Sequence, residues 1–139
     1  MTVETKYLTI QTRGNGDVID MTGDIQESLS SCNITDGILI IFTASATSSI
    51  TTLEFETGCV KDLQRMFDEI ITPEREYSHN KRWGDGNGHS HVRAALLKPS
   101  LTVPFVESKL TIGTWQSIVF VDFDNRERQR EVVLQIIGE

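Results

Sequence analysis

A continuous apolar run in the first third of the chain sets the strongest limit on the fold. It comprises Gly37-Ile-Leu-Ile-Ile-Phe42 and contains no polar side chain. A strand with one face in water alternates apolar and polar residues, whereas a strand covered on both faces reads as an unbroken apolar run. The run therefore predicts a central strand of a sheet that is covered on both faces.

Other strands are expected on both sides of this run. Near the N-terminus Leu8 and Ile10 share one face of an alternating segment, while Tyr7 and Thr9 share the other. After Ser100 the pattern consists of strands joined by short turns, which indicates antiparallel neighbours. The expected strands cover residues 3–12, 18–19, 37–42, 50–56, 101–106, 110–112, 118–123 and 131–137.

Helical periodicity occurs in three segments, which cover residues 22–33, 57–72 and 90–98. The second segment is the strongest, because its apolar residues form one stripe and its charged residues the opposite face. Together these elements predict a single α+β domain over residues 1–139. Its antiparallel sheets would form a sandwich-like arrangement with two or three helices.

Composition narrows the classes of function. The formal net charge of −7 disfavours binding to nucleic acid or to anionic lipid. Arg126, Arg128 and Arg130 form a small basic group, which is interpreted as a solvated turn because acidic residues interleave or flank it. No apolar run is long enough to span a bilayer, and the two cysteines are too few for a disulfide framework. We expect a cytoplasmic protein that binds neither membranes nor nucleic acid.

The polar segment from Tyr77 to His91 contains all three histidines of the chain and a glycine at every second position from 84 to 88. Ser90 or a neighbour is expected to cap a short helix that ends before Pro99. His91 would then lie in or beside the first turn, where unpaired N–H groups favour a neutral imidazole suited to a general base or a metal ligand. The alternative is a solvated glycine-rich connector.

A carboxylate on an early strand is a second candidate. In a strand over residues 50–56, Leu53 and Phe55 point one way while Glu54 and Glu56 point the other. If that face lines a cleft, Glu54 is a candidate for catalysis or ligand binding. If the face is in water, Glu54 is an ordinary exposed glutamate.

The segment Ser100-Leu-Thr-Val-Pro-Phe-Val-Glu-Ser-Lys-Leu-Thr-Ile-Gly-Thr-Trp-Gln116 resembles the signature of the YjbQ family, also called uncharacterised protein family 0047 or the secondary thiamine-phosphate synthase family. The resemblance extends to the Gly-Asn-Gly-His-Ser-His91 segment, to the strand that includes Glu54 and to the strand that ends in Asp122. It implies a small α+β protein, usually a homotrimer with a small-molecule site between subunits. It also implies weak synthesis of thiamine phosphate from hydroxymethylpyrimidine diphosphate and thiazole phosphate.

The family's functional residues carry over at three positions and differ at two. The resemblance implies catalytic roles for His91, Asn87 and Glu54. Ser45 stands where many members have a histidine, and it is taken as a substrate-binding candidate. His89 stands where many members have an aspartate, so a mechanism built on the usual histidine and aspartate does not transfer directly.

The two last histidines also allow a metal site. In an extended segment His89 and His91 would point to one side and could bind one metal ion, with Glu54 or Asp85 as third ligand. In a helix they would diverge by about 200°. For a diphosphate substrate, Mg²⁺ or another divalent metal would need carboxylates, and Glu54, Asp85 and Asp122 are the candidate donors.

Several residues are candidates for substrate binding. Trp115 can stack on a pyrimidine or thiazole ring and Gln116 can read its edge, or Trp115 can be a core or subunit-interface residue. Arg82 and Arg93 can bind phosphate, and Asp85 can contact the ligand. Three functions remain open at this point: an enzyme acting on phosphorylated heterocycles, a non-catalytic metal- or metabolite-binding oligomer, and a structural module.

Overall fold

The structure is a computed structural model that describes all 139 residues. Eight strands and four helices follow one another along the chain. Their bounds are β1 Thr2–Thr12, β2 Asp17–Asp20, α1 Thr22–Ser30, β3 Gly37–Thr43, β4 Ser48–Leu53, α2 Thr57–Ile70, α3 Ser78–Trp83, α4 Gly88–Leu97, β5 Ser100–Val106, β6 Lys109–Leu110, β7 Ser117–Asp122 and β8 Arg128–Gly138. The α+β class and the single domain agree with the expectation.

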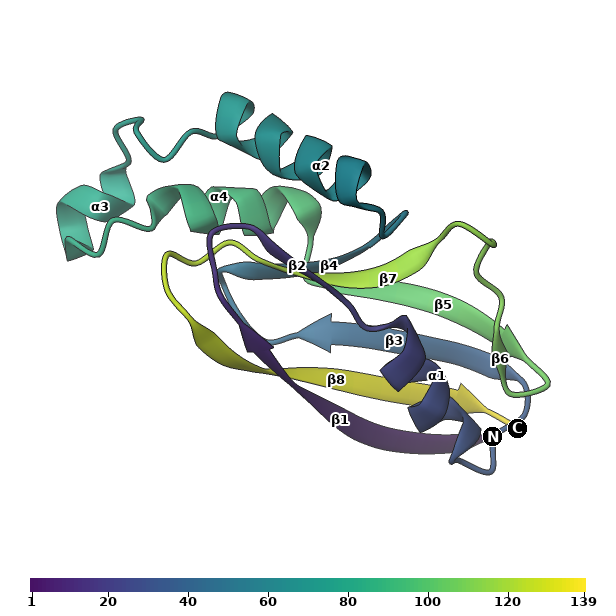
Figure 1. Cartoon of the computed structure of the whole chain (residues 1–139). Helices are drawn as coiled ribbons and strands as arrows, with labels where there is room; N and C mark the ends of the chain where they lie inside the picture. The colour runs from purple at the N-terminus through teal and green to yellow at the C-terminus, as the bar shows by residue number, and fades with distance from the viewer.

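The strands form two antiparallel sheets that pack face to face (Figure 1). The larger sheet has the order β1-β8-β3-β5-β6 and the smaller one the order β2-β7-β4. Their facing side chains form one apolar core with the buried face of α1. Its largest fully buried members include Ile25, Leu29, Leu39, Phe105 and Phe120.

Helices α2 and α4 cover the outer face of the smaller sheet (Figure 1). Phe67 of α2 packs edge-on against Phe123 at a ring-centroid distance of 4.9 Å. The start of α2 is defined by Glu56, whose carboxylate accepts hydrogen bonds from the backbone N–H groups of Gly58 and Cys59 at 2.8 Å each. This capping ends β4 at Leu53, so the expected strand to residue 56 is three residues too long.

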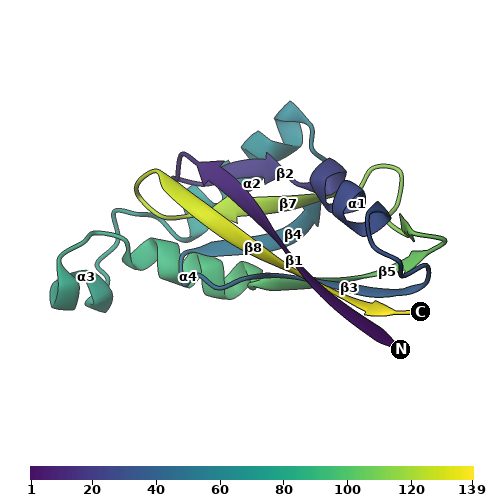
Figure 2. The same cartoon turned by 90° about the horizontal axis from the view of Figure 1, so that it is seen from below.

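The outer face of the larger sheet is not covered within the chain, which corrects the expectation for β3. Leu39 and Ile41 are buried, but Ile38 and Phe42 on the opposite face are 40% and 39% exposed. Figure 2 views the molecule from this side and shows β1 and β8 crossing with no helix over them. The face continues across the sheet through the exposed side chains of Val3, Tyr7 and Val106. An apolar run predicts that both faces of a strand are buried, but it does not show whether the same chain or another one covers them.

The structure contains four helices, one more than expected. The additional helix, α3, ends at Gly84, which adopts the left-handed conformation with φ of 72° and donates its N–H to the carbonyl of Asn80. The glycine-rich segment therefore begins as a helix end rather than as a connector. Figures 1 and 2 both place α3 beyond the edge of the sheets. None of the helices is long and apolar enough to cross a membrane.

Candidate functional site

Two carboxylates at the end of β7 are buried and paired with two arginines of β8. Asp122 Oδ2 lies 2.8 Å from Nε of Arg130, and Asp124 Oδ2 lies 2.7 Å from a terminal nitrogen of Arg128. The side chains of Asp122 and Asp124 are 0% and 2% exposed. The interpretation of the arginines as a solvated turn is therefore wrong for Arg128 and Arg130, because the β7–β8 connection turns them back onto the carboxylates.

Threonine hydroxyls complete this network. Thr12 donates to Asp122 at 2.6 Å, and Thr47 receives a hydrogen bond from Arg130 at 2.9 Å and donates to Asp124 at 3.3 Å. Every charge in the network therefore has a partner, as burial requires. Asp122, expected as a possible metal donor, is unavailable for that role.

Asp124 is held in its ionised form. Burial raises its pKa, but hydrogen bonds from the N–H of Asn125, from Arg128 and from Asn87, together with the Arg128 charge, lower it from 3.8 to about 2. The carboxylate is therefore a fixed acceptor at neutral pH. It is the innermost group of a chain of polar contacts that leads outward to the histidines.

Asn87 links this carboxylate to His79. Its Nδ2 donates to Asp124 Oδ1 at 3.3 Å, and its Oδ1 lies 3.1 Å from His79 Nε2. Asp85 Oδ1 lies 3.4 Å from the same nitrogen of His79. The structure thus brings the predicted residues Asn87 and Asp85 together around a histidine that had no assigned role.

The ring of His91 packs against that of His79 in a tilted arrangement, and His91 faces a pocket. The ring centroids are 4.2 Å apart with an interplanar angle of 47°. Burial and the neighbouring His79 lower the pKa of His91, while Asp85 and Asp124 raise it. His91 lines a pocket of about 300 Å³ whose other walls are small or apolar. The lining residues are Ser45, Ala46, Ser48, His91, Ala94, Ala95 and Pro99.

His89 lies apart from this pair. It belongs to α4, which begins at Gly88, so His89 and His91 project in different directions, as their spacing in a helix requires. His89 is buried, and its Nδ1 has no hydrogen-bond partner. Burial lowers its pKa, and the nearby Arg93 lowers it further, while Asp68 and Asp124 raise it. The expected metal site at His89 and His91 is therefore not formed.

The remaining metal and phosphate candidates also differ from expectation. No group of three or more His, Cys, Asp or Glu side chains in the structure could hold a metal ion, so a divalent metal has no fitting donor set within the chain. Arg93 is buried and donates to the carbonyl of Ile71 at 2.9 and 2.7 Å and to Asp68 at 3.1 Å. It is therefore not free to bind phosphate. Arg82 is exposed and lies over the Trp83 ring at 5.4 Å.

Glu54, Trp115 and Gln116 lie at the other end of the smaller sheet. In the β4–β7 register Ser48 pairs with Asp122 and Leu53 pairs with Ser117. The six residues of β4 therefore separate these three residues from the polar network by about 20 Å, at roughly 3.3 Å per residue. Trp115 is 74% exposed, so it is not a core residue of the single chain.

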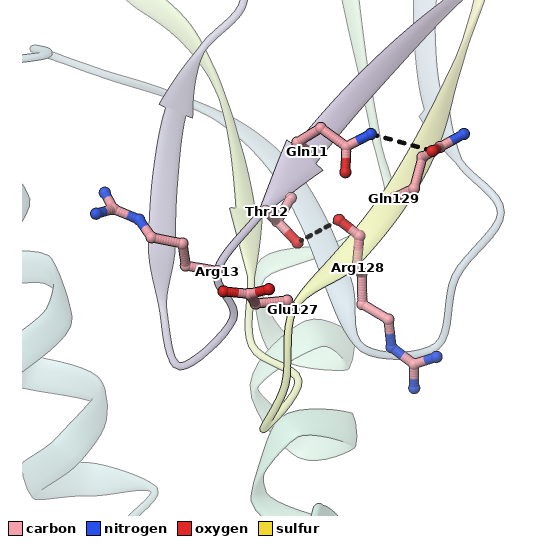
Figure 3. Close-up of a pocket in the computed structure, with 6 residues that line it drawn as sticks. All are labelled: Gln11, Thr12, Arg13, Glu127, Arg128 and Gln129. Atoms are coloured by element: carbon pink, nitrogen blue, oxygen red, sulfur yellow. Dashed lines mark hydrogen bonds between the residues drawn. The ribbon is translucent and has the colours of Figure 1, made fainter.

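A separate hollow on the surface has a volume of about 380 Å³ and is lined only by polar residues (Figure 3). Arg13 pairs with Asp17 at 3.7 Å and Arg128 pairs with Asp124, and Figure 3 shows the two guanidinium groups pointing apart. The hollow therefore has no charged groups that point toward a common ligand, and it has no apolar wall. The pocket beside His91 is the better candidate site.

His79 and Asp124 are the functional candidates that residue patterns missed. His79 lies in the histidine-bearing segment, yet neither the expected helix nor the resemblance distinguished it. Asp124 stands in an apparent turn, where a carboxylate is ordinarily exposed. The sequence does contain one signal: Asp122 and Asp124 are two residues apart, and Arg128 and Arg130 follow with the same spacing. The ion pairs between them become evident only when the structure shows how β7 and β8 lie.

Known proteins match this chain over almost its whole length. The model of the family described as UPF0047 protein YjbQ-like matches residues 6–139. A UPF0047 protein of Methanothermobacter thermautotrophicus is 34% identical over 139 residues, covering 100% of this chain and 95% of that protein. The UPF0047 protein YugU of Bacillus subtilis is 31% identical over 134 residues, covering 96% and 98%.

Solved structures match equally well. A hypothetical protein from Aeropyrum pernix has a TM-score of 0.91 and 32% identity and covers 98% of this chain and 99% of its own. A YbjQ-like protein of unknown function from Sulfolobus solfataricus has a TM-score of 0.89 and 29% identity and covers 99% and 100%. By sequence and by fold, this chain belongs to the YjbQ-like UPF0047 family.

Proposed function

We propose that this protein is an enzyme that uses an imidazole pair to transfer protons during the conversion of a small phosphorylated heterocycle. Thiamine-phosphate formation, the activity that the family resemblance implies, is the specific reaction we propose. The observation that carries this proposal is the contact between the tilted rings of His79 and His91, with centroids 4.2 Å apart, beside the pocket that contains Ser45. Two imidazoles this close cannot both be protonated without repulsion, so one remains available as a base near neutral pH.

The pocket supports a ring-shaped ligand. Its volume of about 300 Å³ suits a small molecule, and its walls are alanine, serine and proline with no charged side chain. A pyrimidine or thiazole ring would lie against these walls, with Ser45 and His91 as its polar contacts. The phosphate groups would lie outside the pocket, with Arg82, an exposed cation of α3, as their proposed partner.

We further propose that the protein is a homotrimer in which the site is completed by a neighbouring copy. Glu54, Trp115 and Gln116 lie at one end of β4 in the β4–β7 register, whereas Ser48, which lines the pocket with His91, is at the other end, about 20 Å away along the six residues of the strand. A head-to-tail arrangement around a threefold axis would bring one end of the smaller sheet against the opposite end of the next copy.

The uncovered face of the larger sheet supports association. Val3, Tyr7, Ile38, Phe42 and Val106 are all 39% or more exposed in the single chain. Monomeric proteins rarely leave an apolar sheet face open to water. A second copy would remove this surface from solvent.

The first experiment measures thiamine-phosphate formation from the two phosphorylated precursors, with and without Mg²⁺. His91→Ala and His79→Ala should each abolish turnover, because each removes one member of the pair. Lys109→Ala is the matched control, since Lys109 is an exposed residue of β6 that contributes to neither cluster. Turnover that persists in both histidine variants would refute the proposal. Binding of a precursor without turnover in the wild type would favour a non-catalytic metabolite-binding protein.

The second experiment tests whether two copies share one site. His91→Ala and Glu54→Ala should each be inactive alone. When the two are unfolded, mixed equally and refolded together, each shared site has intact residues from both sides in about a quarter of cases, which predicts recovery of about a quarter of wild-type activity. No recovery, in mixtures that sedimentation shows to be hybrid oligomers, would refute a site that combines His91 of one copy with Glu54 of another.

A further inference from the structure

A directed chain of hydrogen bonds connects a buried carboxylate to His79. Asp124 Oδ1 accepts from Asn87 Nδ2 at 3.3 Å, and Asn87 Oδ1 lies 3.1 Å from His79 Nε2. Asp124 and Asn87 are 1% and 7% exposed, so water does not replace either partner. The chain extends from the sheet to the imidazole that packs against His91.

The chemistry of each group sets the direction of the next. An ionised carboxylate only accepts hydrogen bonds, so the amide group of Asn87 must face Asp124 with its NH₂. The other oxygen of Asp124 is engaged by Arg128 at 2.7 and 3.0 Å and by Thr47 at 3.3 Å, which fixes the carboxylate itself. The carbonyl oxygen of Asn87 then necessarily faces His79. Because that oxygen is an acceptor, His79 Nε2 must carry the proton.

A second acceptor leads to the same conclusion. Asp85 Oδ1 lies 3.4 Å from His79 Nε2, so both groups near this nitrogen are acceptors. No protein group hydrogen-bonds Nδ1 of His79. In the neutral ring Nδ1 therefore carries the lone pair, and it belongs to a side chain that is 31% exposed.

We propose that Asp124, acting through Asn87, holds neutral His79 in the Nε2–H tautomer, so that Nδ1 of His79 is a proton acceptor of the site. A proton leaving the substrate would pass to Nδ1, and its bonding electron pair would stay on the substrate. The resulting imidazolium would keep its Nε2–H bond to Asn87 and gain the charge of Asp85. His79 is then the acid–base residue, and Asn87 and Asp124 are positioning residues. The use of the proton rests on the proposed function, whereas the tautomer does not.

The experiment is ¹⁵N NMR of the histidine rings in the full-length protein. The chain has only three histidines, so selective labelling gives three ring spin systems, and single His→Gln variants assign them. Long-range ¹H–¹⁵N correlations distinguish a protonated, pyrrole-type nitrogen from an unprotonated, pyridine-type nitrogen. The measurement is made at a pH high enough to keep the ring of His79 neutral.

The expected wild-type result is a pure tautomer, with a pyrrole-type Nε2 and a pyridine-type Nδ1 in His79. In an Asp85→Ala background, which removes the second acceptor and should itself keep the pure tautomer, Asn87→Leu removes the remaining acceptor and should give the averaged nitrogen shifts of a free imidazole. Asp124→Asn in the same background should also give averaged shifts, because the Asn87 amide can then rotate. Asp122→Asn is the matched control: it removes a neighbouring buried carboxylate that does not contact Asn87 and should leave His79 unchanged.

A wild-type spectrum with His79 protonated on Nδ1, or averaged between tautomers, would overturn the inference without any variant. A folded Asp85→Ala/Asn87→Leu protein with an unchanged pure tautomer would overturn it as well. Backbone ¹H–¹⁵N spectra identify variants that do not fold. Absence of thiamine-phosphate formation would leave the spectra as expected, so failure of the proposed reaction and failure of the tautomer chain are distinguishable.

Discussion

The two ends of the smaller sheet differ in how far the chain itself completes them. At one end Asp122 and Asp124 are buried, and all their hydrogen-bond partners come from the same chain. At the other end Trp115 is 74% exposed, and Glu54 is exposed with no ion-pair partner. The first end is organised before any ligand arrives, whereas the second presents an aromatic ring and a carboxylate to solvent.

This difference indicates that the buried end of the sheet positions side chains, whereas the exposed end is available for contact with a ligand or another subunit. A buried charge must be paired by its own fold, because a charge left alone in the interior is costly. An exposed tryptophan carries no such requirement, and its ring is available to a ligand or to another subunit. The contrast leads us to expect large stability effects at the paired end and effects on assembly or binding at the exposed end.

The largest effect is expected for Asp124→Ala. The change leaves Arg128, Asn87 and Thr47 without their common acceptor, and loss of one partner of a buried pair should lower the free energy of unfolding by about 3 kcal/mol. Urea denaturation measures it. Glu54→Ala, at the exposed end, is the control and should stay within about 0.5 kcal/mol of the wild type. Equal losses of unfolding free energy in Asp124→Ala and Glu54→Ala would contradict the difference between the two ends of the sheet.

Acid should weaken the paired end in a defined pH window. The folded pKa of Asp124 is lowered from 3.8 to about 2, so its contribution is present above pH 4 and is lost as the pH falls toward 2. The difference corresponds to about 2 kcal/mol by proton linkage. Unfolding free energies measured at intervals from pH 5 to pH 2 should fall less steeply in Asp124→Asn than in the wild type. Parallel curves for the two proteins would contradict the assigned pKa.

A smaller pH effect is expected from His89. Burial and Arg93 lower its folded pKa below the ordinary 6.5, so the unfolded chain takes up a proton first and stability declines as the pH falls below 6.5. His89→Gln cannot be protonated and should reduce this decline in urea titrations at pH 7.5 and 5.5. Glu54→Gln keeps all three histidines and should retain the wild-type decline. A decline that is unchanged in His89→Gln would assign the effect to other groups.

The smallest stability effect is expected for Trp115→Ala. Because the side chain is 74% exposed, its removal should change the free energy of unfolding of the isolated chain by no more than about 0.5 kcal/mol. Sedimentation and precursor binding should change instead, since both depend on the exposed end in the proposed trimer. A strongly destabilised monomer would show that the indole supports its own subunit.

Sequence patterns predicted most of the elements, but several boundaries and contacts required the fold. The strand 37–42 and the helix starting at residue 57 lie where periodicity places them. Periodicity missed α3, because a six-residue helix is too short to show a stripe. It also extended β4 to residue 56, where the carboxylate of Glu56 caps the next helix instead.

The candidate site was predicted in part. Asp85 and His91 were chosen for their residue types in one glycine-rich segment and Asn87 from the resemblance, and the structure places all three around His79. Glu54 was chosen from the alternation of its strand and from the resemblance, and the β4–β7 register places it at the other end of the sheet. The number of residues between two positions does not give their distance within a sheet, so the sequence could not show that Glu54 lies far from the other candidates.

The amino-acid sequence by itself determined the α+β class, the central apolar strand and the family, because periodicity and local motifs are properties of neighbouring residues. Only the tertiary structure decided that Arg128 and Arg130 pair with the buried carboxylates of Asp124 and Asp122, and that the ring of His79 rather than that of His89 packs against His91. These contacts join separate elements, and their distances follow from the β7–β8 connection, from α3 and from the start of α4. The charge of a buried group depends on such neighbours, so the chemistry of the site became visible only in the folded chain.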